Sequence, residues 1–279
     1  MTDIEYLVII TEPSSKKDHM IDEELVSKVE KKLPDEKGGT LYLILHTNGG
    51  DPFSAVRIMD IINERYSEVF AIVPDRAMSA GTLMALGTNA IYMGQKSKLG
   101  PLDLPIEHPK DGTRISALDV QNTITNLSAL VDNITKKRFK VLRDLKVGKD
   151  TAACEAMECA TNFLEPIITQ IDPYHLQKAY RELKIALFYT YDLLLSRMMT
   201  NTEKAMNTAK ALVNSFPAHE YAILRKEAKY GLGLEIKNLE EFKTWDILKD
   251  EYAKIESTKY YDVQYGKKRT KKIKRKTKK

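Results

Sequence analysis

The chain has 279 residues, of which 43% are hydrophobic and 30% charged, so it is long enough to bury a sizeable core in one or two domains. No apolar run reaches the roughly 18 residues that a membrane-spanning helix needs, and residues 1–5 contain no basic segment that would begin a signal peptide. We therefore expect neither feature. Cys154 and Cys159 lack metal-ligand spacing, and we expect reduced thiols in a cytoplasmic protein.

The formal net charge of +5 comes from the C-terminus. Residues 267–279 contain ten basic and no acidic side chains, and without them the chain has 34 basic and 39 acidic ones. Like charges at this density repel one another, so we predict a disordered basic tail over 267–279. Such a tail fits a contact with nucleic acid or an anionic membrane surface, and equally a solubilising segment without a partner.

The N-terminal part alternates short apolar runs with helical segments. We predict strands over 5–11, 41–46, 69–74 and 90–94, and helices over 22–33 and 52–66. This alternation predicts βαβ units around a parallel sheet, hence an α/β fold class with a βα core over residues 1–113.

The chain beyond residue 113 has mostly helical spacing. We predict a helical extension over 114–266, with helices over 116–145, 151–171, 173–200, 202–215 and 239–257. Aromatic and leucine side chains share one face of the segment 174–199, and a small sheet alone hardly covers a face of that length. We therefore predict a homo-oligomer.

Two turns at the carboxyl ends of predicted strands carry the residue types of a catalytic site. Asn48-Gly49-Gly50 follows the strand over 41–46, and Met78-Ser79-Ala80-Gly81 stands between the strand over 69–74 and a helix. Sites in parallel sheets form at these strand ends. A serine on a sharp bend exposes its hydroxyl, and adjacent glycines let backbone N–H groups approach an oxyanion. A helix N-cap is the commoner role of such a serine, but the two turns together favour a nucleophile.

With these two turns, the chain resembles the Clp-fold serine peptidases, and most closely the SDH family (serine dehydrogenase proteinase), which is related to signal peptide peptidase A and ClpP. Residues 99–103, Leu-Gly-Pro-Leu-Asp, and 216–223, Phe-Pro-Ala-His-Glu-Tyr-Ala-Ile, add to the resemblance. It implies a ClpP/crotonase-like fold and a serine hydrolase that cleaves peptide bonds through an acyl-enzyme. The implied nucleophile is Ser79, and the implied oxyanion donors are the N–H groups of Gly49, Gly50 and Ala80.

A serine nucleophile needs a general base, and the residues leave several candidates open. The resemblance to the SDH patch implies His219. Lys136 and Lys137 fit the lysine base of the signal peptide peptidase relatives, and His108 lies near the spacing of the ClpP histidine.

Three neighbouring positions bear on the site without a decided role. Asp103 either orients the base or joins a subunit contact, and we expect His46 to brace the glycine turn rather than take part in the chemistry. At Asp75-Arg76 the chain departs from the family, in which a histidine is frequent just before the serine segment.

No Walker pattern, dinucleotide glycine fingerprint or paired metal-ligand motif is present. We therefore predict an ATP-independent serine peptidase with a peptide or protein substrate and no cofactor or metal. Two alternatives stay open: a crotonase-like acyl-CoA enzyme, which shares the oxyanion-hole fold but has no serine nucleophile, and a non-catalytic scaffold that binds partners through its helices or tail.

Overall fold

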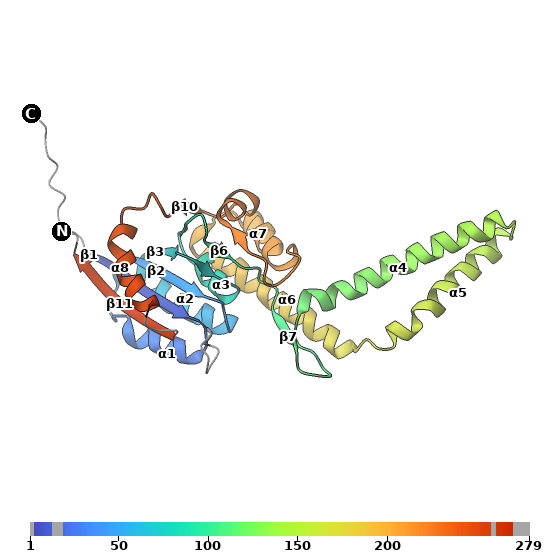
Figure 1. Cartoon of the computed structure of the whole chain (residues 1–279), viewed down its shortest axis with the longest axis horizontal. Coiled ribbons are helices and arrows are strands. Elements are labelled where there is room, and N and C mark those ends of the chain that lie inside the picture. Colours follow the sequence, from blue (N-terminus) through green and yellow to red (C-terminus); the bar gives the residue numbers. More distant parts are fainter. Residues whose placement is uncertain (1–2, 13–18, 258–260, 270–279) are drawn as a thin grey trace, which may run out of the picture. The chain divides into compact units, whose positions relative to one another are not determined.

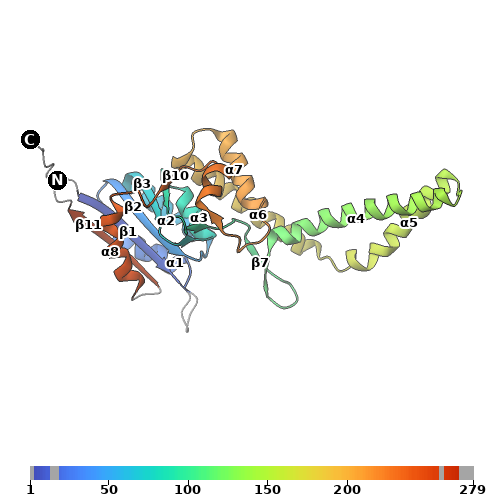
Figure 2. The same cartoon turned by 45° about the horizontal axis from the view of Figure 1, so that its top comes forward.

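The computed structural model describes residues 3–12, 19–257 and 261–269, and Figure 1 and Figure 2 show their helices and strands. The chain divides into two compact units, which are described separately below. Unit 1 contains Met1–Asp103 and Ala186–Lys279, and unit 2 contains Leu104–Ile185. This division differs from the predicted boundaries at 113 and 266, because the end of the chain returns to unit 1 and adds strands to its sheet.

Unit 1 is built on a nine-stranded sheet. The strand order along its main path is β10-β5-β3-β2-β4-β6-β9, and β1 lies between β2 and β11. The strands are β1 (Asp3–Thr11), β2 (Gly38–Thr47), β3 (Tyr66–Val73), β4 (Arg76–Ala77), β5 (Ala90–Met93), β6 (Lys98–Leu99), β9 (Ile223–Leu224), β10 (Ile236–Asn238) and β11 (Tyr261–Arg269).

The predicted parallel core is confirmed. β1 pairs with β2, β2 with β3, and β3 with β5, all in parallel. The connections are α1 (Glu23–Lys32) and α2 (Pro52–Arg65), each of which begins after an aspartate. Asp22 Oδ1 accepts the Leu25 N–H at 2.9 Å, and Asp51 Oδ2 accepts the Ser54 N–H at 2.7 Å. These N-caps satisfy helix-end donors, so the strands end and the helices begin where the sequence places the caps.

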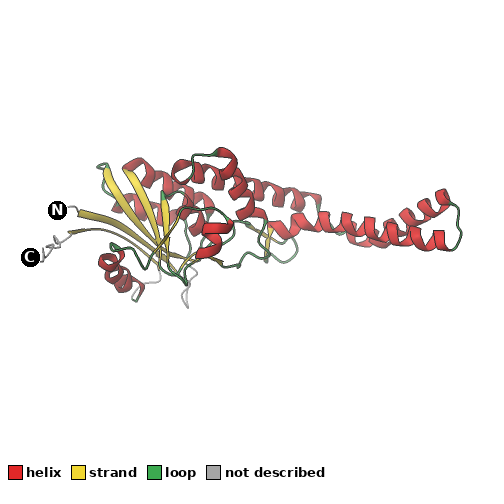
Figure 3. Cartoon of the chain, turned by 90° about the horizontal axis from the view of Figure 1, so that it is seen from above, coloured by secondary structure: helices red, strands yellow, loops and turns green. Residues whose placement is uncertain are grey.

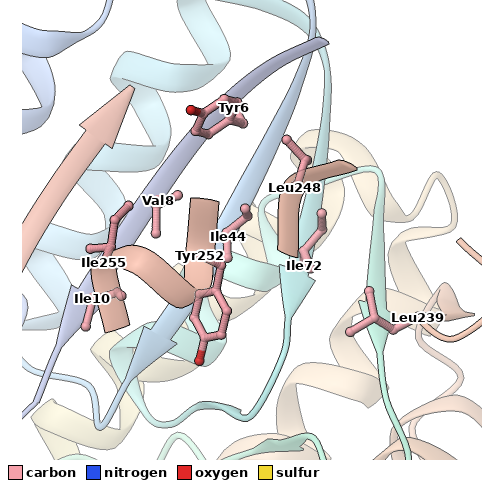
Figure 4. Packing of buried hydrophobic residues seen from close by; sticks show 9 residues of the cluster. All are labelled: Tyr6, Val8, Ile10, Ile44, Ile72, Leu239, Leu248, Tyr252 and Ile255. Atoms are coloured by element: carbon pink, nitrogen blue, oxygen red, sulfur yellow. The ribbon is translucent and has the colours of Figure 1, made fainter. Parts of the chain in front are cut away.

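The two faces of the sheet are covered by different helices (Figure 3). Alternate residues of β1 to β3 meet α8 (Trp245–Glu256) in the cluster of Figure 4, which contains Tyr6, Val8, Ile10, Ile44, Ile72, Leu239, Leu248, Tyr252 and Ile255. Successive side chains of a strand point to opposite faces, so the buried Leu7, Ile9 and Leu43 project to the other face. Two consecutive right-handed crossovers in the same direction put α1 and α2 on that face.

The remaining helical elements of unit 1 are α3 (Ala80–Leu86), the last part of α6 (Pro173–Leu193), the π-helical turns η1 (Leu194–Met198) and η2 (Glu227–Gly231), and α7 (Thr202–Asn214). Arg197 of η1 ties this region to the sheet. Its guanidinium donates to the Tyr66 and Ser67 carbonyl oxygens, each at 2.6 Å, and to Asn63 Oδ1 at 2.6 Å. One side chain therefore satisfies the carbonyls where β3 begins.

Unit 2 contains a strand hairpin and long helices. β7 (Pro105–Glu107) pairs antiparallel with β8 (Arg114–Ser116). α4 (Ala117–Asp144) and α5 (Lys149–Ile168) are joined by the short turn 145–148 and pack through Leu142, Ala152 and Ala156. The first part of α6 completes the unit. Within the described ranges, no helix is long and apolar enough to cross a membrane.

The prediction of a disordered tail from residue 267 is wrong for its first three residues, because β11 extends to Arg269 antiparallel to β1. Two acidic partners offset the basic charge: Glu5 lies 2.8 Å from Lys267 Nζ, and Glu251 lies 2.8 Å from Lys268 Nζ. Residues 270–279 lie outside the described residues.

We predict that Gly266→Val destabilises unit 1. A Cβ at Gly266 would lie 2.4 Å from Tyr6 Oη and 2.5 Å from Tyr6 Cζ, and Tyr6 is only 5% exposed. Overpacking of this kind costs about 1–3 kcal/mol. The measurement is the free energy of unfolding in urea. Gly39→Val is the matched control, because a Cβ at Gly39 of β2 would meet no described atom within 4 Å beyond its chain neighbours. Equal effects of the two substitutions would contradict the packing of β11 on β1.

Candidate active site

Ser79 stands on a strained turn between β4 and α3. Its φ of 48° lies in the left-handed region, which only one other non-glycine residue of the described chain enters. Ser79 occupies the N-cap position of α3, yet its side chain makes no capping hydrogen bond. The prediction that Ser79 begins a helix is confirmed. Strain at a non-glycine residue and a hydroxyl not used for capping are typical of a nucleophile turn.

Close backbone packing fixes the turn. Thr82 Oγ1 donates to the Ala77 carbonyl at 2.7 Å and accepts the Gly100 N–H at 2.9 Å. A Cβ at Gly100 would lie 2.9 Å from the Ser79 nitrogen, and one at Gly81 would lie 2.4 Å from Thr47 Cγ2. The segment that begins at Gly100 therefore lies directly against Ser79, and glycine is needed at both positions.

The glycine turn after β2 adjoins the serine turn, as the sequence predicts. Gly49 and Gly50 have φ values of 108° and 150°. A Cβ at Gly49 would lie 2.9 Å from Ser79 Cβ and 2.8 Å from the Met78 carbonyl oxygen. Gly50 lies against Ile21, whose N–H donates to the Gly49 carbonyl at 2.9 Å.

The three candidate oxyanion donors are not equivalent. The Gly49 N–H donates to Thr47 Oγ1 at 2.9 Å, and Thr47 Oγ1 lies 2.5 Å from Thr11 Oγ1. Thr47 is fully buried, and sequence reasoning did not single it out. A threonine directly after the predicted strand, two residues before the glycine pair, was the available signal. The N–H groups of Gly50 and Ala80 make no hydrogen bond with another described residue. Gly50 and Ala80 thus remain as donors, whereas Gly49 is engaged.

His219 and Asp103 form a pair in unit 1. His219 Nδ1 donates to Asp103 Oδ1 at 3.0 Å, and Asp103 is 3% exposed. The hydrogen bond to Asp103 raises the pKa of His219 above its ordinary value of 6.5, and burial of the ring opposes this shift. With Nδ1 engaged, Nε2 is the nitrogen that remains for proton exchange.

Three very short strands connect the segments that carry this pair with the segment that leads to the serine turn. β4, which leads to Ser79, pairs with β6 through Ala77 and Leu99, and β6 pairs with β9 through Leu99 and Ile223. Asp103 follows β6, and His219 precedes β9. Ser79 Oγ makes no hydrogen bond with another described residue, so the contact of serine with histidine is not part of this geometry.

The other candidate bases belong to unit 2. His108 contacts Asp111 Oδ1 at 3.1 Å in the hairpin of unit 2, and Lys136 and Lys137 lie on α4 of the same unit. His46 lies in β2 and is 2% exposed. Its Nδ1 lies 2.5 Å from Tyr252 Oη, and its Nε2 lies 2.6 Å from Glu12 Oε1. Neither contact is to the glycine turn, so the bracing role expected for His46 stays a prediction.

Comparison with protein families places this geometry in a known group. The model of the family described as ClpP-like SDH-type serine proteinase matches residues 5–185. The chain belongs to this family. The matched range includes Ser79, both turn glycines and Asp103, and it ends before His219. Membership confirms the family resemblance and the ClpP-like α/β fold class predicted from the sequence.

Two relatives come from Methanocaldococcus jannaschii. The uncharacterized protein MJ0137 is 37% identical over 82 residues, which cover 29% of this chain and 28% of that protein. The uncharacterized protein MJ1495 is 22% identical over 234 residues, which cover 82% of this chain and 64% of that protein. The chain therefore spans less than two thirds of the length of both relatives.

Solved structures are more distant. A mutant of the 1510-N membrane-bound stomatin-specific protease in complex with a substrate peptide is 13% identical with a TM-score of 0.43, covering 79% of this chain and 71% of that chain. An enoyl-CoA hydratase/isomerase from Marinobacter aquaeolei is 14% identical with a TM-score of 0.22, covering 59% of this chain and 79% of that chain. Neither similarity is high enough to carry an argument.

We predict that Asp103→Asn lowers the pKa of His219, because the carboxylate is the main cause of its raised value. A raised pKa in the folded state means that the pair adds stability below about pH 6.5, and that this stability is lost as the pH rises through the folded-state pKa. The measurement is an NMR titration of the histidine ring protons, with the other four histidines as internal controls. An unchanged pKa of His219 would contradict the pairing.

Proposed function

We propose that the chain is a serine peptidase in which Ser79 is the nucleophile, His219 the general base and Asp103 the residue that orients it. The observation that carries the proposal is the approach of the two turns. Gly49 packs against Ser79 with no room for a Cβ, so the turn that contains Gly50 adjoins the serine, and the N–H groups of Gly50 and Ala80 have no hydrogen-bond partner among the described residues. The His219–Asp103 pair supplies a base whose Nδ1 is engaged by Asp103, which leaves Nε2 as the proton acceptor.

Each residue has a defined step in this proposal. Ser79 Oγ attacks the carbonyl carbon of the peptide bond as its proton passes to His219 Nε2. The Gly50 and Ala80 N–H groups donate to the oxyanion that forms. His219 then gives the proton to the leaving amine, and the C–N bond breaks to leave an acyl-enzyme. A water molecule, deprotonated by the same nitrogen, releases the acid and restores Ser79.

The absence of a Ser79–His219 hydrogen bond is compatible with this role. Catalytic hydrogen bonds are often long in the free enzyme and shorten in the complex with substrate. The side chain of His219 is 28% exposed and comes from the segment between α7 and β9, so it is partly accessible to a bound substrate.

We predict that a fluorophosphonate probe labels Ser79. Ser79→Ala should abolish labelling, and His219→Ala should lower its rate by about 10²–10⁴-fold, the usual contribution of a general base. His108→Ala is the matched control and should label like the wild type, because His108 contacts Asp111 in unit 2. Full labelling of the His219 variant, with loss in Lys136→Ala or Lys137→Ala, would contradict the assignment of the base.

The labelling rate also tests the base through its pH dependence. It should rise with pH through the pKa of His219, hence above 6.5, because only neutral imidazole accepts the proton of Ser79. A rise confined to strongly alkaline pH would indicate a lysine instead.

We further propose a homo-oligomer. Large apolar side chains are exposed on α4, α5 and the turn between them: Leu130, Val141, Leu145, Met157, Phe163, Ile167 and Ile168. Apolar side chains gathered on one hairpin are typical of an interaction surface. The face predicted on 174–199 is divided, since Tyr180 and Phe188 are exposed whereas Leu183 and Leu194 are buried.

We predict that light scattering at micromolar concentration gives a multiple of the 31.8 kDa chain mass. The double substitution Met157→Lys, Phe163→Lys should lower that mass, because it places charge in the apolar hairpin surface. Glu155→Lys, Glu158→Lys is the matched control at exposed positions of the same helix. A wild-type monomer would contradict the proposal. The cytoplasmic location and the contacts of the basic tail stay predictions from the sequence.

A further inference from the structure

Arg76 lies in β4, three residues before Ser79, and its guanidinium links three segments of unit 1. Its Nε donates to Asn48 Oδ1 at 2.7 Å, its Nη1 donates to Asp75 Oδ2 at 2.5 Å, and its Nη2 contacts Glu12 Oε1. The side chain is 22% exposed. Asn48 is the residue immediately before the glycine pair, so Arg76 joins the strand that carries the nucleophile to the turn that carries an oxyanion donor.

One of the two carboxylate partners of Arg76, Glu12, has a further contact. Glu12 Oε1 lies 2.6 Å from His46 Nε2, and His46 Nδ1 lies 2.5 Å from Tyr252 Oη. The Tyr252 hydroxyl in turn donates to Glu256 at 3.0 Å. Figure 4 shows the Tyr252 ring in the apolar cluster under α8, with its hydroxyl at the margin. A continuous line of polar contacts therefore leads from α8 to Arg76.

The guanidinium of Arg76 is planar, so the positions of its two Nη groups determine the direction in which its Nε–H bond points. Both Nη groups are fixed by carboxylates, and a guanidinium presents its donors in a rigid fork. The Nε–H bond then fixes the side-chain amide of Asn48. A lysine has one point charge on a flexible stem and does not reproduce this arrangement.

Oxyanion binding requires a fixed distance between the glycine turn and the serine turn. The Gly50 and Ala80 N–H groups belong to different segments, and donors act on an oxyanion only within about 2.7–3.1 Å of it. Backbone contacts between the segments run through Thr47, whose carbonyl accepts the Met78 N–H at 3.0 Å. Asn48 and the glycine pair follow Thr47 in the chain. The hydrogen bond between Arg76 and Asn48 links this part of the turn to β4.

We propose that Arg76 is a positioning residue that holds the Asn48-Gly49-Gly50 turn at its working distance from Ser79. This inference rests on the proposed function, since it assigns the turn to oxyanion binding. Arg76 touches no reacting atom. Its loss lets the glycine turn move while β4 and Ser79 remain in place.

The test compares Arg76→Gln and Arg76→Lys with the wild type by the kinetics of fluorophosphonate labelling. The maximal labelling rate should fall by about 10–100-fold in Arg76→Gln, in keeping with the cost of a misplacement near 1 Å. The probe concentration for half-maximal rate should change little, because Arg76 lies outside the serine turn. Arg76→Lys should not restore the rate. The matched control Arg57→Gln breaks an exposed ion pair with Glu23 in the same unit and should label normally.

A second labelling test uses the variant Asn48→Ala. If Arg76 acts through Asn48, then the double variant Asn48→Ala, Arg76→Gln should label no more slowly than the slower single variant. Additive losses would overturn the inference, as would an unchanged maximal rate in Arg76→Gln. Full recovery of the rate in Arg76→Lys would also overturn it, because charge alone would then suffice.

Hydrogen exchange separates failure of this inference from failure of the proposed function. The Gly49 amide, which donates to Thr47 Oγ1, should exchange faster in Arg76→Gln than in Arg57→Gln, whether or not Ser79 reacts with the probe. Faster exchange without any labelling of wild-type Ser79 would contradict the proposed peptidase function, while the proposal that Arg76 links the two turns would stand. Unchanged exchange would refute the positioning role of Arg76 even if the wild type is labelled.

Discussion

The contact of Gly49 with the Met78-Ser79 peptide is the constraint on which the rest of the site depends. A Cβ at Gly49 would overlap both the Met78 carbonyl oxygen and Ser79 Cβ, so the chain must carry glycine there. This approach brings together one turn from the end of β2 and another from the start of α3. The catalytic interpretation follows from that approach, because two N–H groups without partners among the described residues then flank a hydroxyl that caps no helix.

The second half of the chain supports this contact from two directions. The segment between α7 and β9 brings His219 to Asp103, next to the short strands that lead to Ser79. On the other face of the sheet, α8 covers β1 to β3 and places Tyr252 against His46. The chain beyond residue 185 is therefore an integral part of unit 1, although the family match ends there.

The sequence predicted the parts of the fold that local periodicity encodes. The parallel strands, the helices α1 and α2, and the serine at the start of a helix were all predicted correctly, because each depends on residues close in the chain. It did not predict β11, whose partner residues in β1 lie at least 250 positions away. The alternation of Tyr261, Val263 and Tyr265 with polar residues was the local signal, and the basic run that follows hid it.

The candidate site, like the fold, was predictable only where it depends on residues close in the chain. Ser79 and the glycine pair occupy turns that sequence spacing identifies, whereas their mutual distance depends on strand order. The Asp103–His219 pair joins residues 116 positions apart, so the sequence alone left the base undecided among four residues. The difference between Gly49 and Gly50 as donors depends on Thr47 Oγ1, a contact that only side-chain geometry reveals.

The most direct measurement is a crystal structure of the chain after reaction with a fluorophosphonate. The account predicts phosphorus bonded to Ser79 Oγ, with the phosphoryl oxygen about 2.7–3.1 Å from the nitrogens of Gly50 and Ala80, the distance range of an oxyanion hole. An adduct on another residue, or a phosphoryl oxygen directed away from both nitrogens, would contradict it.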